Sequence, residues 1–391
     1  MKKKLILISL MILIVSGLFI RTGVAQGGLE RRLETYLQVL DIVKSDFVEE
    51  KVDDQQLVYG SIRGLLSALD DPYTRFVEPK AYKEMQVRMS GSYSGIGIYI
   101  GMKEKALTVI SPIDGTPANK AKLKASDQIA TIDGKKTKDM ALEEAVGLIR
   151  GPRGTKVVLG ILRKDWQEPK DFAIVRDSIK IKCLKVKTVD KDIAYIKLNT
   201  FENLSAAQEF EKEVRAAQAK KGLIIDLRGN GGGLLQNAIE IGSLFIDDGL
   251  IVQTVDREGR LEELKSRGRV IWRKPAVVLI NEASASASEI LAGAMRDNKV
   301  AKLVGTKSFG KASVQNVRRL NDGSALLVTV AKYRTPNGED ISKKGIAPDI
   351  EVVMTTAEVE ALIESEDDAD DPQLRKAIET VRQLIKEGLN G

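Results

Sequence analysis

The chain has 391 residues, 43% of them hydrophobic and 30% charged, which is enough apolar material for two or three folded domains. It contains no histidine and a single cysteine, Cys183, which excludes Ser/His/Asp and Cys/His catalysis, histidine metal ligands and an internal disulfide. The net charge is +6, but Lys2, Lys3, Lys4 and Arg21 supply four of these charges and removing them leaves +2. Nothing in this balance favours a nucleic-acid partner.

The first 25 residues have the pattern of a secretory signal peptide. A lysine-rich start is followed by an apolar run over residues 5–20 and by small residues before Gln26. We therefore expect an exported protein of the periplasm or cell envelope. The apolar run is also close to the length of a membrane span, so an uncleaved N-terminal anchor is the alternative, and it is the one membrane contact that the sequence predicts.

Residues 29–84 are predicted to form an N-terminal helical arm. Apolar side chains recur at helical spacing over residues 33–47 and again over residues 57–66. Aspartates 53 and 54 could cap the second helix, and the Asp-Pro pair at 71–72 is expected to end it.

The middle of the chain predicts two folded bodies. Residues 85–170 hold short β-like runs and two helical stretches, which is typical of a compact inserted module. Residues 177–355 alternate strands with helices, which predicts an α/β core. The core strands are expected at 193–198, 223–227 and 276–280, and the core helices at 205–220, 234–245 and 288–297.

The last part of the chain, residues 356–391, is predicted to be an acidic linker and a helix. The acidic run over residues 364–371 is typical of a solvated segment. Pro372 suits the first turn of a helix, and the apolar stripe that follows consists of Leu374, Ile378, Val381 and Leu384.

A tract of small residues, Asn-Glu-Ala-Ser-Ala-Ser-Ala-Ser-Glu at 281–289, follows an apolar strand and precedes a helix. Such a turn exposes a side chain and directs free backbone amides at the same place, so a serine there could attack a carbonyl group while the amides hold the oxyanion. Alternatively, Ser286 and Glu289 fit the Ser-x-x-Glu capping box, which needs no chemistry. These residues alone do not distinguish Ser284, Ser286 and Ser288.

Residues 305–312, Gly-Thr-Lys-Ser-Phe-Gly-Lys-Ala, nearly match the phosphate-binding P-loop, and residues 223–226 resemble a strand that ends in a magnesium-binding carboxylate. Nucleotide hydrolysis is the main rival enzyme class. It fails because Ala312 stands where a hydroxyl should bind magnesium, and because the carboxylate strand precedes the loop. The same segment contains the Ser-x-x-Lys of β-lactamase-like enzymes, but a glycine weakens the required helix and no Lys-Thr-Gly occurs.

Two glycine-rich segments could bind anionic groups. Residues 226–233, Asp-Leu-Arg-Gly-Asn-Gly-Gly-Gly, follow a buried-looking strand and could donate amides to an anion or oxyanion, or could be a flexible turn. Gly95-Ile96-Gly97-Ile98 leads into a predicted edge strand, where amides could bind a terminal carboxylate and a peptide could add as a further strand.

Together these segments resemble the carboxy-terminal processing (tail-specific) proteases, over nearly all of residues 29–353. The resemblance implies a multidomain α/β (α+β) protein whose mixed-sheet, ClpP/crotonase-like core carries an inserted PDZ domain at 85–170. It also assigns residue roles: Ser286 as nucleophile, Lys311 as base, Gln315 as its helper, Gly232 and Ala287 as oxyanion donors, Asp297 as a supporting acid, and Gly95, Ile96, Gly97 and Ile98 as the peptide-binding loop.

The resemblance has departures, of which two lie near the implied site: Ala312 and Gly231 stand where the family commonly has glycine and proline. Neither removes a reacting group. Gln315 can reach the Lys311 amine only if residues 311–315 form a helical turn, because an extended segment would separate them by about 13 Å.

The implied activity is endopeptidase cleavage through an acyl-enzyme, with no metal or organic cofactor. The implied partners are protein substrates with apolar free C-termini, an activating adaptor, and other copies of the chain joined through the terminal helices. The alternative is a catalytically silent envelope scaffold that binds protein tails through its PDZ domain.

Overall fold

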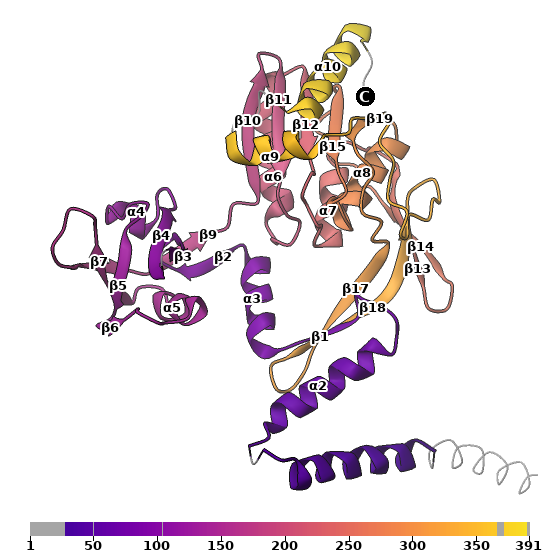
Figure 1. Ribbon diagram of the computed structural model, residues 1–391. Coiled ribbons are helices and arrows are strands. Elements are labelled where there is room, and N and C mark those ends of the chain that lie inside the picture. Colours follow the sequence, from indigo (N-terminus) through magenta and orange to yellow (C-terminus); the bar gives the residue numbers. More distant parts are fainter. Residues whose placement is uncertain (1–27, 50, 104, 366–370, 389–391) are drawn as a thin grey trace, which may run out of the picture. The chain divides into compact units, whose positions relative to one another are not determined.

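The computed structural model describes residues 28–49, 51–103, 105–365 and 371–388, and it contains two compact units, Met1–Asp70 and Asp71–Gly391 (Figure 1). The predicted signal peptide lies outside the described residues. Among the helices that are described, none combines the length and the apolar character needed to cross a membrane.

The first unit consists of a helix over residues 28–46 and of α2 (Asp54–Ser67). Asp53 caps α2, since its side chain accepts the amides of Gln55 and Gln56. Two side-chain contacts link the helices: Tyr36 to Ser61 at 2.8 Å and Lys44 to Asp54 at 2.8 Å. The two predicted helices of the arm are confirmed.

The core of the second unit is a six-stranded sheet in the order β10-β11-β12-β15-β16-β19. Its five last strands are parallel, and β10 pairs with β11 in the antiparallel direction, so the sheet is mixed as expected. Every residue of the central strands β12 and β15 is buried, as a sheet covered on both faces requires. The strands are β10 (Leu184–Asp190), β11 (Ile193–Leu198), β12 (Gly222–Asp226), β15 (Ala276–Ile280), β16 (Lys302–Gly305) and β19 (Ile350–Glu351).

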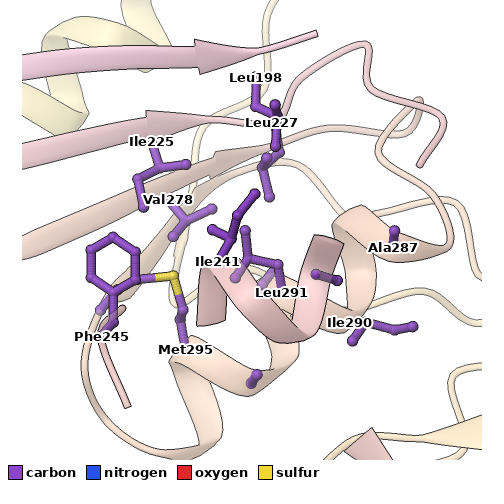
Figure 2. Close-up of a cluster of buried hydrophobic side chains, with 14 of the residues drawn as sticks. Leu198, Ile225, Leu227, Ile241, Phe245, Val278, Ala287, Ile290, Leu291 and Met295 are labelled. Atoms are coloured by element: carbon purple, nitrogen blue, oxygen red, sulfur yellow. The ribbon is translucent and has the colours of Figure 1, made fainter. Parts of the chain in front are cut away.

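One face of this sheet packs on helices α6 (Ala206–Ala216), α7 (Leu235–Gly242) and α8 (Ala287–Asp297). Figure 2 shows the apolar side chains of α8 directed at those of the strands. A turn of 3-10 helix, Ala217–Ala219, continues α6. The buried side of α8 fixes the start of this helix, where the serine tract lies.

The other face is covered by α10 (Pro372–Glu387), drawn yellow in Figure 1. The predicted apolar stripe of α10 packs against side chains of β11, β12, β15 and β16. The chain's own sheet therefore covers this stripe, and the expected subunit contacts through the terminal helices stay a prediction. A further helix, α9 (Thr356–Ser365), precedes α10.

A second, antiparallel sheet contains the segment that follows Lys311. Its order is β1-β18-β13-β14, and β17 pairs with the other edge of β18. The strands are β1 (Arg75–Val77), β13 (Leu250–Asp256), β14 (Leu261–Lys265), β17 (Ser313–Arg319) and β18 (Ala325–Arg334). Residues 29–84 are therefore not a purely helical arm, since β1 pairs with a strand about 250 positions later in the chain. Helix α3 (Pro79–Ser90) follows β1.

The inserted module has its own sheet and its own buried core. The chain enters it through β2 (Ser92–Gly95) and leaves through β9 (Asp177–Lys180), which pair with each other. The module ends at Val175, five residues beyond the expected boundary, because β8 pairs with β7. Its other elements are β3 (Ile98–Lys103), β4 (Ala106–Pro112), α4 (Pro117–Lys120), β5 (Gln128–Ile132), β6 (Lys135–Lys136), α5 (Leu142–Ile149), β7 (Lys156–Leu162) and β8 (Lys170–Val175).

Candidate active site

Three serines lie in the turn after β15 or in the first turn of α8, and their surroundings differ. Ser284 is fully buried, and its hydroxyl donates to the carbonyl of Leu227 at 2.9 Å. Ser288 is also fully buried, and its hydroxyl donates to the carbonyl of Asn230 at 2.8 Å. Ser286 is only half-buried. Of the three, it is the serine that a substrate can reach.

Ser286 has an unusual backbone conformation for a helix N-cap. Its φ is 56° and its ψ is −116°, whereas Asp53 and Asp371, which cap α2 and α10, are extended with φ −80° and −78°. A positive φ in a residue other than glycine costs about 1–3 kcal/mol and persists only where the surrounding structure enforces it. One such place is a nucleophile on a sharp turn from a strand to a helix. The capping box of Ser286 and Glu289 is present, but capping alone does not require this strain.

The buried carboxylate of Glu289 connects the serine turn to the segment that contains Lys311. One of its oxygens accepts the amides of Ser286 and Lys311, each at 2.9 Å, so these two nitrogens are no further apart than twice that distance. The other oxygen accepts the amide of Gly310 at 2.7 Å and the hydroxyl of Ser308 at 2.6 Å. A single side chain therefore holds the backbones of the candidate nucleophile and base next to each other.

Tyr333 of β18 makes a second link between the same two backbones. Its hydroxyl donates to the carbonyl of Lys311 and lies 3.2 Å from the carbonyl of Ser286. Burial raises the pKa of this tyrosine well above its usual value, and the nearby charge of Glu289 acts in the same direction. Tyr333 is therefore a neutral hydrogen-bond donor at any pH at which the protein works.

The amine of Lys311 lies over the ring of Tyr73, with Nζ 4.8 Å from the ring centroid. Burial lowers the pKa of this amine below its usual value, and the positive charge of Arg75 lowers it further, while Asp71 and Glu289 act in the opposite direction. A lowered pKa increases the neutral fraction of the amine, which is the form that can accept a proton.

The glycine-rich loop after β12 lies directly against the serine turn. At Gly232, φ is 96° and a Cβ atom would lie 2.8 Å from the Cβ of Ser286 and 2.9 Å from the amide nitrogen of Ala287, so no side chain fits there. However, the Gly232 amide donates to the side-chain oxygen of Asn230 at 2.9 Å, so it is not the free oxyanion donor that was expected. Ala287 is the first residue of α8, and its amide has no carbonyl one turn earlier in the helix to bind.

The P-loop-like segment at 305–312 cannot receive a phosphate in this structure. The amides of Gly310 and Lys311 donate to Glu289, and the amide of Phe309 donates to the carbonyl of Ser284. The carboxylate expected to bind magnesium, Asp226, is fully buried and paired with Arg228 at 2.7 Å. The chain's own carboxylate thus occupies the place of the anion, and the NTPase hypothesis is wrong.

Comparison with known proteins gives the family. The model of peptidase family S41 matches residues 192–352, the PDZ domain model matches 84–162, and the activating protease CtpB N-terminal domain model matches 22–81. A carboxyl-terminal-processing protease of Synechocystis sp. is 39% identical over 79% of this chain and 74% of its own length. The chain belongs to the carboxyl-terminal processing proteases of family S41. The carboxy-terminal processing protease CtpA of Bacillus subtilis is also 39% identical, over 80% of this chain and 67% of its own.

Carboxyl-terminal processing proteases are serine peptidases, so the chain is an enzyme of this class and the silent-scaffold alternative loses its support. The fold agrees with a solved Bacteroides fragilis protein assigned to the S41 proteases, which has 15% identity and a TM-score of 0.51 over 82% of this chain and 90% of its own. The inserted module is the PDZ domain of the family.

The predicted peptide-binding loop of this PDZ domain lies between two strands. Gly95 ends β2, Ile98 begins β3, and the side chain of Ile96 is buried in the module's core. The carbonyls of Ile96 and Gly97 accept the amides of Ala118 and of the residue at 113, which anchors the loop. In the order of described strands, β3 lies at the edge of its sheet, so a peptide could pair with it.

Two further predicted site residues of the protease, Gln315 and Asp297, have structural partners of their own. Gln315 lies in the strand β17, not in a helical turn after Lys311, and its side-chain amide donates to Ser313 and Thr329. Asp297 ends α8, so it is about 16 Å along the helix from Ser286. It pairs with the neighbouring Arg296 and accepts the amide of Asn337, and its role as a supporting acid stays a prediction.

The sequence analysis missed the residues that hold the site together. Glu289 was considered only as half of a capping box. Its contacts with the donors at residues 308–311 depend on the three-dimensional fold, so the sequence does not show them. Tyr73 comes from the turn before β1 and Tyr333 from β18, both far from the serine tract in the sequence, and no local pattern marks their contact with it. Asn230 was only part of a glycine-rich loop, yet its backbone carbonyl accepts Ser288 and its side chain holds Gly232.

Proposed function

We propose that this protein is an exported serine endopeptidase that cleaves proteins selected by their C-terminal tails, with Ser286 as nucleophile and Lys311 as base. The observation that carries the proposal is the double acceptance of the Ser286 and Lys311 amides by one oxygen of Glu289. A structural serine cap would not need its backbone joined to that of a half-buried lysine.

In this mechanism the neutral amine of Lys311 takes the proton of the Ser286 hydroxyl as Oγ attacks the carbonyl carbon of the scissile bond. The amide of Ala287 stabilises the oxyanion. The ammonium of Lys311 then protonates the leaving amine, and the C–N bond breaks. In the second half, the neutral amine takes a proton from water as the water oxygen attacks the acyl carbon; the ammonium then returns this proton to Oγ as the ester C–O bond breaks, which releases the acid and regenerates Ser286 and neutral Lys311.

Selection of tails is proposed from the PDZ domain, where a free carboxylate would bind the amides of residues 96–98 and the tail would pair with β3. Export is proposed from the signal-like pattern of the first 25 residues, which also predicts a periplasmic or envelope location. An activating adaptor and a homo-oligomer are further expectations from the family resemblance.

The test compares the parent with Ser286→Ala, Lys311→Met, Ser284→Ala and Ser288→Ala on a protein substrate with an apolar free C-terminus. We expect cleavage to disappear in the first two variants, because they lack the nucleophile and the base. The other two serines are buried donors to carbonyls, so their variants should lose about 1 kcal/mol of stability and remain active.

Fragment masses report cleavage, and thermal melting reports folding. Activity that survives Ser286→Ala but not Ser284→Ala or Ser288→Ala contradicts the assignment of the nucleophile. Activity of Lys311→Met contradicts the base. Amidation of the substrate's C-terminus should slow cleavage, and an unchanged rate would show that tails are not selected by their carboxylate.

A further inference from the structure

The ring of Tyr73 contacts the amine of Lys311. Among the residues that the structure describes, this amine makes no hydrogen bond or ion pair, and its contact is the ring face of Tyr73 at 4.8 Å. A general base must come within about 2.6–3.2 Å of the proton it takes. The amine is thus held by an aromatic ring and not by the hydroxyl of Ser286.

The position of Tyr73 is fixed by its neighbours. The hydroxyl of Thr74 donates to Asp71 at 2.6 Å and accepts the amide of Thr329 in β18 at 3.0 Å. The amide of Tyr73 itself also donates to Asp71, at 3.1 Å. Immediately after this turn, β1 pairs with β18. The backbone of Tyr73 therefore belongs to a turn that is bonded to the antiparallel sheet of β1 and β18.

An aromatic ring face attracts a cation and has no comparable attraction for a neutral amine. The contact between Tyr73 and Lys311 therefore favours the ammonium form. The charged groups near the amine act in both directions: Arg75 of β1 disfavours the ammonium, whereas Asp71 of the turn and Glu289 of α8 favour it. Burial disfavours it most. Tyr73 thus acts against the change that prepares Lys311 to accept a proton.

We propose that Tyr73 is a positioning residue that restrains the protease, because its ring holds Lys311 as a cation away from Ser286 until the amine is released. The proposal rests on the proposed role of Lys311 as base. It assigns a function in the reaction to a turn outside the S41 family match, within the matched N-terminal domain. Loss of the ring face should make the neutral amine easier to form.

The experiment uses the full chain with Tyr73→Leu, which keeps an apolar side chain without a ring face, and Tyr73→Phe, which keeps the face as a matched control. Reactivity of the Lys311 amine is measured in a Ser286→Ala background by trace acetylation with acetic anhydride over a range of pH, followed by mass spectrometry. This readout needs no protease activity. The pH dependence of kcat/KM is measured in parallel with Ser286 present.

We expect Tyr73→Leu to lower the midpoint of Lys311 acetylation by about half a pH unit, and Tyr73→Phe to leave it unchanged. Below the midpoint, kcat/KM of Tyr73→Leu should rise about threefold, since half a unit changes the neutral fraction by that factor. An unchanged or raised midpoint, or the same shift in Tyr73→Phe, overturns the proposal. If the Tyr73 proposal fails in this way while Lys311→Met is inactive, the proposed function still stands. If Lys311→Met is active, both the role of Lys311 as base and the role of Tyr73 are overturned.

Discussion

Replacing Glu289 by glutamine tests the centre of the site with almost no change in volume. The amide NH2 must take the place of one of two carboxylate oxygens, and each oxygen accepts two donors in this structure. Whichever oxygen the NH2 group replaces, this group, which is itself a donor, then faces two buried donors that have lost their acceptor. At about 1–3 kcal/mol for each unsatisfied buried group, we expect a loss of about 2–6 kcal/mol of unfolding free energy. That is a large part of the usual 5–15 kcal/mol, so the variant should fold but melt earlier.

The same change should separate the backbones of Ser286 and Lys311, and a misplacement of about 1 Å can cost about 100-fold in rate. The assay is kcat/KM on a peptide or protein substrate at a temperature well below the midpoint of melting. Glu282→Gln is the matched control, because Glu282 lies in the same turn, is exposed, and accepts a single hydroxyl from Thr306. If Glu289→Gln melts and cleaves like Glu282→Gln, the shared carboxylate does not organise the site.

Two further predictions concern the loop after β12. Gly232→Ala should abolish cleavage, because its Cβ would lie within 3 Å of Ser286 and Ala287. Gly231→Ala has open space at its Cβ and should retain cleavage. The test compares kcat/KM of the two variants, and equal activities would contradict the close approach of the loop to the serine turn. Asp371→Asn should keep its cap on α10 but weaken the pair with Arg228 at 2.8 Å, which we expect to lower the unfolding free energy by about 1–3 kcal/mol in denaturant without changing kcat/KM. An unchanged midpoint would mean that Asp226 alone satisfies the arginine.

The core of the fold could be predicted from the sequence because its strands are short, continuous apolar runs. The strands at 193–198 and 276–280 were predicted at the bounds that the structure has, and α8 within one residue. A parallel sheet buried on both faces leaves this strong local signal. The antiparallel sheet leaves a weaker one: the three residues of β1 show no periodicity, and their strand identity depends on the distant partner β18.

The candidate site was predictable only in part, for a related reason. Ser286 and Lys311 were assigned through a family resemblance, since capping and catalysis predict the same residues in the serine tract. Gln315 was also assigned through the resemblance, on the condition that residues 311–315 form a helical turn, but the structure puts Gln315 in the strand β17. Asp297 was carried over from the family without any local reason, and in the structure it forms an ion pair with its neighbour.

In the proposed mechanism Lys311 must be neutral before it can accept a proton, and several groups of the site act on its charge in opposite directions. The negative charge of Glu289 would by itself keep Lys311 protonated, and so would Asp71. Glu289 can nevertheless stand close to the base because backbone amides and a hydroxyl surround its oxygens and because burial of the amine, helped by Arg75, has the larger effect on its pKa. The carboxylate thus positions the proposed nucleophile and base through their backbone amides, while the side-chain amine of Lys311 is contacted by the ring of Tyr73.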